Sequence, residues 1–468
     1  MRSAIDEVAG ELASGFAGDL LRSGDPAFEA ARGVWNGMVQ RTPALILRCA
    51  GVADVQRAVR ACSAAGVLTA VRCGGHSLAG FSSCDGGVVI DLGRMRQVTV
   101  DASRRRARAA GGCLLGSIDS ATQAAGLAFP AGVVSHTGAS GLILGGGTGW
   151  LTRLCGLSCD NVEAFTLVTA DGSVVRAAES ENPDLYWALR GGGGNFGVVT
   201  EFELRLHPVS SVTLASAWTA ASDALRVLRF WREFMPSAPD ALKWNLGLTL
   251  APDSNAIPAA LRHRPAVSHG IAWFGDQDEG RSWLRKIFSA VMPATSSTLH
   301  LSFLALQTMA DSDFPHGARY YTKSGYFSEL DDETVAHMMD AVASVPSPKS
   351  QVELAYLGGA AARVGAAETA FGDRSAPFIM NLLGHWTDAQ ADAANVAWVR
   401  SLFDAVRPRM RPGVYVNFMS GDEAGRVQEA YSMRWERLVE IKRRWDPRNF
   451  FRLNQNVQPG EARKTASS

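Results

Sequence analysis

Three glycine runs before residue 207 constrain this chain more than any other feature of its sequence. They are Gly74-Gly75, Gly145-Gly146-Gly147 and Gly191-Gly192-Gly193-Gly194. Glycine lets backbone N–H groups converge on a phosphate, so several such runs can wrap around a dinucleotide, although any one run alone is more often a turn. A Rossmann unit at Gly145 to Gly149 is a poor interpretation, because no strand leads directly into it and no acidic residue is suitably placed downstream.

The composition is that of a soluble globular protein with more than one domain. Of the 468 residues, 47% are hydrophobic and 20% are charged. The 46 Lys and Arg residues equal the 46 Asp and Glu residues, so no net charge attracts nucleic acid or an anionic membrane. No apolar run approaches the ~20 residues of a membrane span. Acidic residues interrupt the N-terminal region, which therefore lacks a signal-peptide core. We expect a cytoplasmic protein with neither a nucleic-acid nor a membrane partner.

The hydrophobic pattern changes near His207-Pro208, where we place a domain boundary. Before it, short strand-like and helical segments alternate. After it, strand-like runs separated by helical runs predict an antiparallel sheet covered by helices on one face. Further along, we expect a strand at Val414 to Met419, a strand at Leu299 to Leu306 and a long helix at Gly421 to Trp445.

Two nucleophilic side chains stand on glycine-flanked turns. His76 follows Gly74-Gly75 at the end of a predicted strand, and Cys159 follows Gly156 in a polar turn that continues to Asn161. A neutral imidazole can add to the 8α-methyl group of an oxidised flavin, and an accessible thiolate can add at C6. A lone histidine is more often structural, but its position after the glycines favours chemistry. The remaining cysteines fit small buried hydrophobes, and we predict no metal site.

Four motifs in the right order carry a family resemblance over roughly residues 30 to 459. Val71 to Ser77 resembles the histidyl-flavin loop of the berberine-bridge-enzyme-like oxidoreductases, within the vanillyl-alcohol-oxidase (PCMH-type) flavoprotein superfamily. Gly156 to Asn161 resembles their cysteinyl-flavin segment, and Gly191 to Thr200 the stretch that contacts the adenine half of FAD. Arg437 to Asn456 resembles the family's C-terminal signature.

The resemblance implies an α+β fold with a FAD domain of two α/β subdomains, built from both ends of the chain, and a substrate domain between them. The implied parts are residues 1–207 for the FAD domain, 208–425 for the substrate domain, 426–460 for a segment returning to the FAD domain, and 461–468 for a disordered tail. The cofactor would be FAD, bound covalently through both His76 and Cys159.

Further flavin contacts implied by the resemblance come from the glycine-containing segments and the C-terminal signature. They are Arg72, Cys73, Gly74, Gly75, Ser77, Leu78, Gly132, Ser135, His136, Thr137, Gly138, Gly141, Leu142, Gly146, Asn161, Gly194, Gly197, Val198, Val199, Asn454 and Asn456.

Two residues are candidates for the base that the family mechanism needs beside the flavin ring. Tyr415 occupies a position resembling the family's catalytic tyrosine, but a phenol with the usual pKa of ~10 is a weak base unless a neighbour lowers that pKa. Glu353 shares one strand face with Gln351 and Ala355 and could abstract a proton directly. The alternative for Tyr415 is a structural residue of the core, and the alternative for Glu353 is an exposed residue of the surface. Leu357 departs from relatives with an aromatic residue there.

The segment Val134 to Gly138 resembles a bacterial branch that includes polyketide oxygenases, in which the pair matching His136 and Thr137 lies by flavin N5 and helps to handle O2. Gly247 stands where that branch has a substrate-contacting tyrosine, so a shared branch does not imply a shared reaction.

The leading hypothesis is an oxidase that takes hydride from a small organic, secondary-metabolite-like substrate to flavin N5 and reduces O2 to hydrogen peroxide. Small residues at Gly138 and Ala139 beside the ring would admit O2. A flavin-N5-oxide oxygenase acting on a polyketide-like substrate and a carbohydrate oxidase are the alternatives. A binding module without catalysis is disfavoured, because both candidate bases accompany the anchors.

Overall fold

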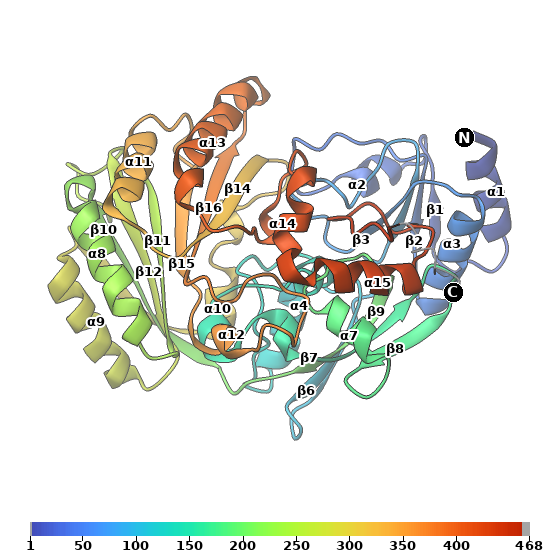
Figure 1. Cartoon of the computed structure of the whole chain (residues 1–468), viewed down its shortest axis with the longest axis horizontal. Coiled ribbons are helices and arrows are strands. Elements are labelled where there is room, and N and C mark those ends of the chain that lie inside the picture. The colour runs from blue at the N-terminus through green and yellow to red at the C-terminus, as the bar shows by residue number, and fades with distance from the viewer. Residues whose placement is uncertain (1, 461–468) are drawn as a thin grey trace, which may run out of the picture.

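Two halves of different construction face each other in this computed structural model, which describes residues 2–460 (Figure 1). The half that carries both ends of the described chain contains a four-stranded and a five-stranded sheet. The other half is built on one seven-stranded sheet. This architecture confirms the predicted α+β class. The predicted disordered tail, 461–468, lies outside the described residues.

Short strands and helices alternate along the chain, with longer strands after residue 207. The strands are β1 (Asp19–Leu21), β2 (Leu45–Arg48), β3 (Thr69–Arg72), β4 (Val88–Asp91), β5 (Val98–Asp101), β6 (Arg106–Ala110), β7 (Val162–Val168), β8 (Val174–Ala178), β9 (Val198–Arg205), β10 (Ser211–Ala220), β11 (Leu242–Leu250), β12 (Pro265–Trp273), β13 (Thr295–Ser302), β14 (Arg319–Phe327), β15 (Gln351–Tyr356) and β16 (Phe378–Trp386). The helices are α1 (Arg2–Leu12), α2 (Phe28–Arg32), α3 (Val52–Ala64), α4 (Leu115–Gln123), α5 (Ala139–Leu144), α6 (Thr152–Cys155), α7 (Pro183–Leu189), α8 (Ala224–Phe234), α9 (Gln277–Val291), α10 (Phe303–Thr308), α11 (Asp332–Ala343), α12 (Gly359–Arg363), α13 (Asp392–Val406), α14 (Val427–Tyr431) and α15 (Trp435–Trp445).

The two smaller sheets differ in strand direction. In the four-stranded sheet, β4 lies between β2 and β3 and is parallel to both, while β1 pairs antiparallel at the edge. All four residues of β4 are buried, which fits a continuous apolar strand inside a parallel layer. The five-stranded sheet is antiparallel in the order β5-β6-β9-β7-β8. Strand β3, at the opposite edge of this sheet from β1, pairs only with β4 and leads into the turn that contains His76.

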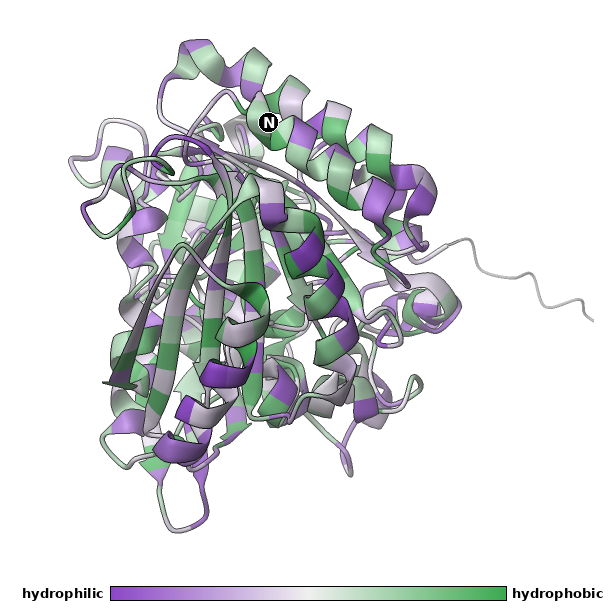
Figure 2. Cartoon of the chain, turned by 90° about the vertical axis from the view of Figure 1, so that its left-hand side faces the viewer, coloured by the Kyte–Doolittle hydropathy of each residue, from purple (hydrophilic) through white to green (hydrophobic). Residues whose placement is uncertain are grey.

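The seven-stranded sheet is antiparallel in the order β13-β10-β12-β11-β15-β16-β14. Helices α8, α9, α11 and α13 pack on one face, and Figure 2 shows them in front of the strands. Trp231 of α8 and Trp244 of β11 are fully buried in the core between them. This confirms the predicted antiparallel sheet with helices on one face, and the uncovered face is turned toward the first half.

The C-terminal segment is held against the glycine run at 191–197 by a buried ion pair. Lys442 Nζ lies 2.7 Å from Asp446 Oδ2 and also donates to the backbone oxygens of Asn195 and Phe451. Asp446 accepts the backbone N–H groups of Phe450 and Phe451. Because every polar atom of this pair has a partner, it fixes the return of the chain to the first half.

Three element predictions need correction. Val414 to Met419 is not a strand but a loop with a short 3-10 turn at Val416–Phe418, and it already packs with the core of the first half, earlier than the predicted return at 426. The run predicted as a strand at Leu299 to Leu306 turns helical after Ser302, whose side chain caps α10. The predicted long helix at Gly421 to Trp445 is broken, because Ser432 has a positive φ between α14 and α15.

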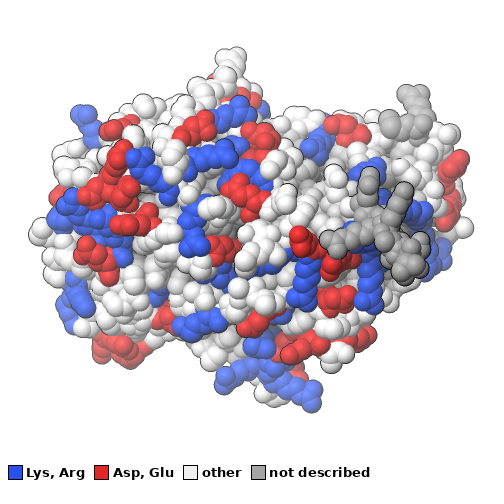
Figure 3. Space-filling view, viewed as in Figure 1, with Lys and Arg blue, Asp and Glu red and all other residues white. Residues whose placement is uncertain are grey.

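Charged residues of both signs are interspersed over the face shown in Figure 3. Within residues 2–460, no helix has both the length and the apolar character to cross a membrane.

Candidate active site

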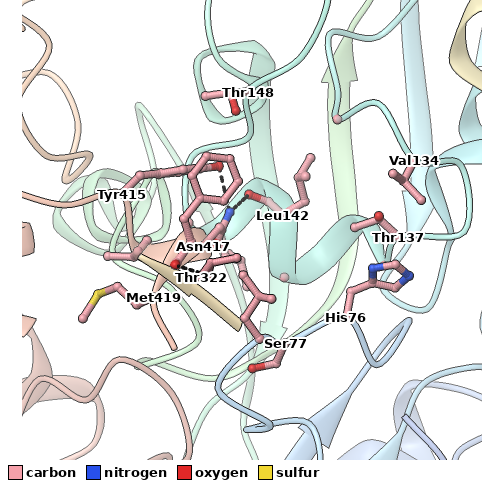
Figure 4. A pocket seen from close by; sticks show the side chains of 18 of the residues that line it. His76, Ser77, Val134, Thr137, Leu142, Thr148, Thr322, Tyr415, Asn417 and Met419 are labelled. Atoms are coloured by element: carbon pink, nitrogen blue, oxygen red, sulfur yellow. Dashed lines mark hydrogen bonds between the residues drawn. The ribbon is translucent and has the colours of Figure 1, made fainter. Parts of the chain in front are cut away.

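A cavity of about 620 Å³ lies between the two halves of the molecule. One wall is formed by the glycine-containing segments of the first half together with the C-terminal segment. The other wall is formed by the uncovered face of the large sheet, from β11, β12, β15 and β16. We call these the glycine wall and the sheet wall. Figure 4 shows His76, Thr137 and Val134 on one side of the cavity and Tyr415 and Asn417 on the other.

Close backbone contact shapes the glycine wall. A Cβ added at Gly74 would lie 2.3 Å from the backbone nitrogen of Gly138, and one added at Gly138 would lie 2.3 Å from the backbone nitrogen of Gly74. The turn after β3 and the start of α5 can therefore approach each other this closely only because both contact residues are glycine. In contrast, a Cβ at Gly141 or Gly194 would meet no atom within 4 Å, although both residues line the cavity. Their backbone is open to a ligand.

His76 projects from this wall with one ring nitrogen already engaged. Its Nε2 lies 2.7 Å from Nδ1 of His136, and its ring stacks on Trp35 at a centroid distance of 4.7 Å. No described residue forms a hydrogen bond with Nδ1 of His76. Burial, followed by the nearby His136 and His316, lowers the pKa of His76 to about 2. The imidazole is therefore neutral at ordinary pH, which is the nucleophilic form.

His316, from the loop before β14, completes a cluster of three histidines. One ring nitrogen from each of His76, His136 and His316 lies within 4.8 Å of the others, and the side chain of His316 is exposed. The cluster links the buried His76 to the surface. Sequence reasoning missed this cluster, because His316 is distant in the chain and stands in no motif.

Glu353 projects from the sheet wall into the same cavity. Asn381 Nδ2 donates to its Oε2 at 2.7 Å, and Gln351 Nε2 donates to its Oε1 at 2.8 Å. Burial raises the pKa of this carboxyl, and the two amide hydrogen bonds oppose the rise without cancelling it. The surface alternative for Glu353 is thus wrong, since this face of β15 lines the cavity. A carboxylate held in this way can accept a proton.

Tyr415 is buried at the junction of the two walls. Its hydroxyl oxygen accepts hydrogen bonds from the backbone N–H of Gly147 and from Asn417 Nδ2, each at 2.9 Å. Burial raises the pKa of Tyr415 to about 12, even though these two donors oppose the rise. The lowering of this pKa that a tyrosine base would need is therefore not provided by the surroundings.

Most of the residues predicted to contact the flavin line the cavity. They are Cys73, Gly74, Gly75, His76, Ser77, Leu78, Gly132, Thr137, Gly138, Gly141, Leu142, Gly194, Gly197, Val198, Val199 and Asn454.

Several others do not line the cavity, and for three of them the contacts within the protein show why. Arg72 pairs with Asp91 at 2.7 Å, and Ser135 bonds to Asp311 through both its backbone nitrogen and its hydroxyl. The amide of Asn161 donates to the backbone oxygens of Cys155 and Leu157. The predicted contacts in this group are Arg72, Ser135, His136, Gly146, Asn161 and Asn456.

Cys159 is the most consequential correction. Its side chain is 0% exposed, does not line the cavity, and packs in a closed cluster with Leu157, Phe371 and Tyr415. Tyr415 belongs both to this cluster and to the cavity lining, so the thiol lies in the layer behind the wall. Burial and the adjacent Asp160 raise the pKa of the thiol, which disfavours the thiolate. The geometry contradicts an accessible second anchor at this position.

The small residues predicted to admit O2 have other roles. Ala139 is buried and does not line the cavity. The small size of Gly138 is already required for its contact with Gly74.

Sequence reasoning missed several polar residues of the sheet wall. Lys243 and Asn245 line the cavity from the same face of β11, Ser268 from β12 and Asn381 from β16. In β11, Lys243 and Asn245 alternate with the apolar residues Leu242, Trp244 and Leu246, so the sequence indicates that the two polar residues share one face of the strand. It does not indicate that the other half of the molecule covers this face.

The cavity has the donor and acceptor pattern of a dinucleotide site. Backbone from separate glycine segments faces it, and the side-chain oxygens of Asn245, Asn381 and Asn454 have no hydrogen-bond partner among the described residues. Buried acceptors of this kind are normally satisfied by a ligand or water. These features fit a flavin nucleotide, which the residues of the glycine wall would hold.

Comparisons with known proteins agree with this geometry. Residues 43–178 match the family model described as FAD binding domain, and residues 414–458 match the model described as berberine and berberine like. The second match covers the loop with Tyr415 and the segment anchored by Lys442.

Relatives match nearly the whole chain. The (R)-6-hydroxynicotine oxidase of Paenarthrobacter nicotinovorans is 30% identical over 467 residues, which covers 94% of this chain and 97% of the relative. The crystal structure of 6-hydroxy-D-nicotine oxidase from Arthrobacter nicotinovorans superposes with a TM-score of 0.84 at 27% identity, covering 95% of this chain and 99% of the other. Glucooligosaccharide oxidase from Acremonium strictum, described as carrying 6-S-cysteinyl, 8α-N1-histidyl FAD, shares the fold with a TM-score of 0.87 at 22% identity, over 97% and 100% of the two chains.

Proposed function

Because the chain belongs to the berberine-like family of FAD-linked oxidoreductases, we propose that it is an oxidase in which His76 alone holds the flavin covalently and Glu353 is the base. The observation that carries the proposal is that these two side chains reach one cavity from opposite walls. When bound, FAD supplies the acceptor for a hydride, and O2 restores its oxidised form with release of hydrogen peroxide.

Nδ1 of His76 is the nitrogen available for attachment, because Nε2 already faces His136 at 2.7 Å. N1 attachment is the linkage named for the glucooligosaccharide oxidase, which supports this choice of atom. Attachment through Nδ1 would need the single ring proton of His76 on Nε2, and that proton would leave as the N–C bond forms, because burial disfavours a charged imidazole. The 8α C–H bond would break in exchange, and its electron pair would remain on the flavin until O2 reoxidises it. His136 Nδ1 can share the ring proton of His76, and the exposed His316 can pass it toward solvent.

Glu353 receives the proton that leaves the substrate's hydroxyl or amine as its C–H bond is oxidised. Its raised pKa makes the carboxylate a stronger base than an exposed glutamate, and the amides of Asn381 and Gln351 hold both oxygens in place. The hydroxyl of Tyr415 is a positioning group, because its oxygen is occupied by two donors and its pKa is raised.

The proposed oxidase differs from the oxygenase alternative in the fate of O2. A panel of alcohols and amines is mixed anaerobically with the purified holoenzyme, and bleaching of the flavin identifies substrates. Readmission of isotopically labelled O2 should then place the label only in hydrogen peroxide. Label in the organic product would reject the oxidase in favour of an oxygenase. A flavin that no member of the panel bleaches would contradict the proposal as a whole.

A further inference from the structure

The sheet wall holds a buried cation that the proposed chemistry does not use. Lys243 is 4% exposed and lines the cavity from β11. Its ammonium group forms no hydrogen bond, and no described carboxylate lies within the 4 Å limit of an ion pair. Among the described lining residues, Lys243 and Glu353 are the only lysine, arginine, aspartate or glutamate side chains.

A second cation lies behind Lys243 and makes its surroundings more electropositive. Arg153 is 2% exposed, and its guanidinium donates only to backbone oxygens, those of Leu242, Ala238 and Pro239. Its Nη1 has no hydrogen-bond partner among the described residues. Two buried positive charges without a paired carboxylate are unfavourable unless an anion joins them. Burial, followed by Arg153, lowers the pKa of Lys243 to about 7, in keeping with the missing counter-ion.

The position of Lys243 along its strand places this charge apart from the base. Gly247 pairs with Glu353 across β11 and β15, and Lys243 lies on the same face of β11 as Gly247. At about 3.3 Å per residue, the Cα of Lys243 is about 13 Å along the strand from that pair. The flexible side chains of Lys243 and Glu353 can thus reach opposite ends of one small molecule. Between them lie the amide of Asn245 and the apolar side chains of the wall.

We infer that Lys243 binds the anionic group of the substrate, so that this enzyme acts on an organic acid, with the carboxylate at Lys243 and the oxidised carbon near Glu353. The inference rests on the proposed function for the reaction, but the anion site itself is defined by Lys243, whose surroundings the buried Arg153 makes more electropositive. An anionic substrate would supply the counter-charge that Lys243 lacks, whereas a neutral sugar could only accept its hydrogen bonds.

Calorimetric titration of the holoenzyme with 2-naphthoate and with 2-naphthamide tests the inference, because the two probes have nearly the same shape and differ in charge. The wild-type protein should bind the acid at least 10-fold more tightly than the amide. Lys243→Met should weaken binding of the acid at least 10-fold and leave binding of the amide within 2-fold. Lys286→Met, which removes an exposed lysine on the outer helix α9, should leave both affinities unchanged.

Two results would overturn the anion site: equal binding of acid and amide by the wild type, or an acid-to-amide ratio unchanged by Lys243→Met. A shift of the flavin redox potential in Lys243→Met, with an unchanged ratio, would assign the charge to the cofactor instead. Flavin content is read separately from the absorption spectrum. A protein that carries no flavin but still selects the acid through Lys243 would contradict the proposed oxidase and support the anion site.

Discussion

The glycine wall and the sheet wall face the same cavity but are built from different materials. The glycine wall presents mainly backbone and one reactive imidazole, that of His76. A side chain at Gly74 or at Gly138 would collide with the backbone of the other residue. The sheet wall presents side chains from alternate positions of β11 and β15, including Lys243 and Glu353. The first wall suits a constant cofactor, and the second suits a substrate that differs from one relative to the next. The proposal thus assigns cofactor binding to one wall and substrate chemistry to the other, and mutations can test each assignment.

The largest effect should come from the base on the sheet wall. Glu353→Gln keeps the size of the side chain, replaces one acceptor oxygen with an N–H donor and removes the basicity, so turnover should fall by about 100- to 10,000-fold. Flavin content should be unchanged, because the residue lies on the opposite wall from His76. Oxygen uptake measures turnover. Glu329→Gln, at an exposed position after β14, is the control. Turnover within 3-fold of wild type would remove Glu353 from the mechanism.

A steric change on the glycine wall should damage folding rather than chemistry. Gly138→Ala places a methyl group 2.3 Å from the backbone nitrogen of Gly74, so it should destabilise the protein by about 1–3 kcal/mol and lower flavin content. Thermal unfolding checks this. Gly425→Ala, at a position that does not line the cavity and where the methyl group meets no atom within 4 Å, should leave the melting temperature unchanged. Equal melting temperatures for both variants would show that the crossing tolerates a side chain.

Tyr415 lies where the two walls meet, and its replacement should have a smaller effect than that of Glu353. Tyr415→Phe removes the acceptor for Gly147 N–H and Asn417 but no base, because burial raises the pKa of the phenol to about 12. We expect turnover to fall by less than about 10-fold, within the range of lost hydrogen bonds. A loss greater than that of Glu353→Gln, measured by the same oxygen uptake, would transfer the role of base to Tyr415.

The smallest effect concerns the contact that joins the two halves. Asp119 of α4 accepts a hydrogen bond from Gln307 of α10, and Gln307 also donates to the backbone oxygen of Gly132 on the glycine wall. Burial, followed by nearby Asp311, raises the pKa of Asp119 to about 7. The folded state therefore favours the protonated carboxyl more strongly than the unfolded state does.

A carboxyl with a raised folded pKa contributes stability that is complete below its unfolded pKa of about 4 and is lost as the pH rises through about 7. Asp119→Asn, which cannot ionise, should therefore melt a few degrees higher than wild type at pH 8 and gain less at pH 5. An equal difference between the two proteins at both pH values would show that Asp119 does not titrate in this range.

The glycine wall could be predicted from the sequence because its requirements are local. Gly74-Gly75-His76 combines a turn, a close backbone approach and a nucleophile within a few adjacent residues. The sheet wall could be predicted only in part, since the alternation in Gln351, Glu353 and Ala355 defines a face but not what covers it. Lys243 was missed because its exposed or buried state depends on the second half of the molecule, and His316 because it reaches the cluster from a distant loop.

Cys159 shows the opposite failure. Its turn has the local composition of an accessible site, but the segment between β15 and β16 and the loop that carries Tyr415 pack over it. The carboxylate of Asp160 forms an ion pair with Arg374 at 2.6 Å instead of facing solvent. Accessibility is a property of packing, and no short motif reports it.

Flavin fluorescence of the denatured protein after gel electrophoresis tests the central claim most directly. The account predicts a fluorescent band for wild type and for Cys159→Ala, and no band for His76→Ala, because only His76 reaches the cavity. His136→Ala should give a weaker band, since His76 then lacks the partner for its Nε2. Loss of the band in Cys159→Ala, or its persistence in His76→Ala, would contradict the account.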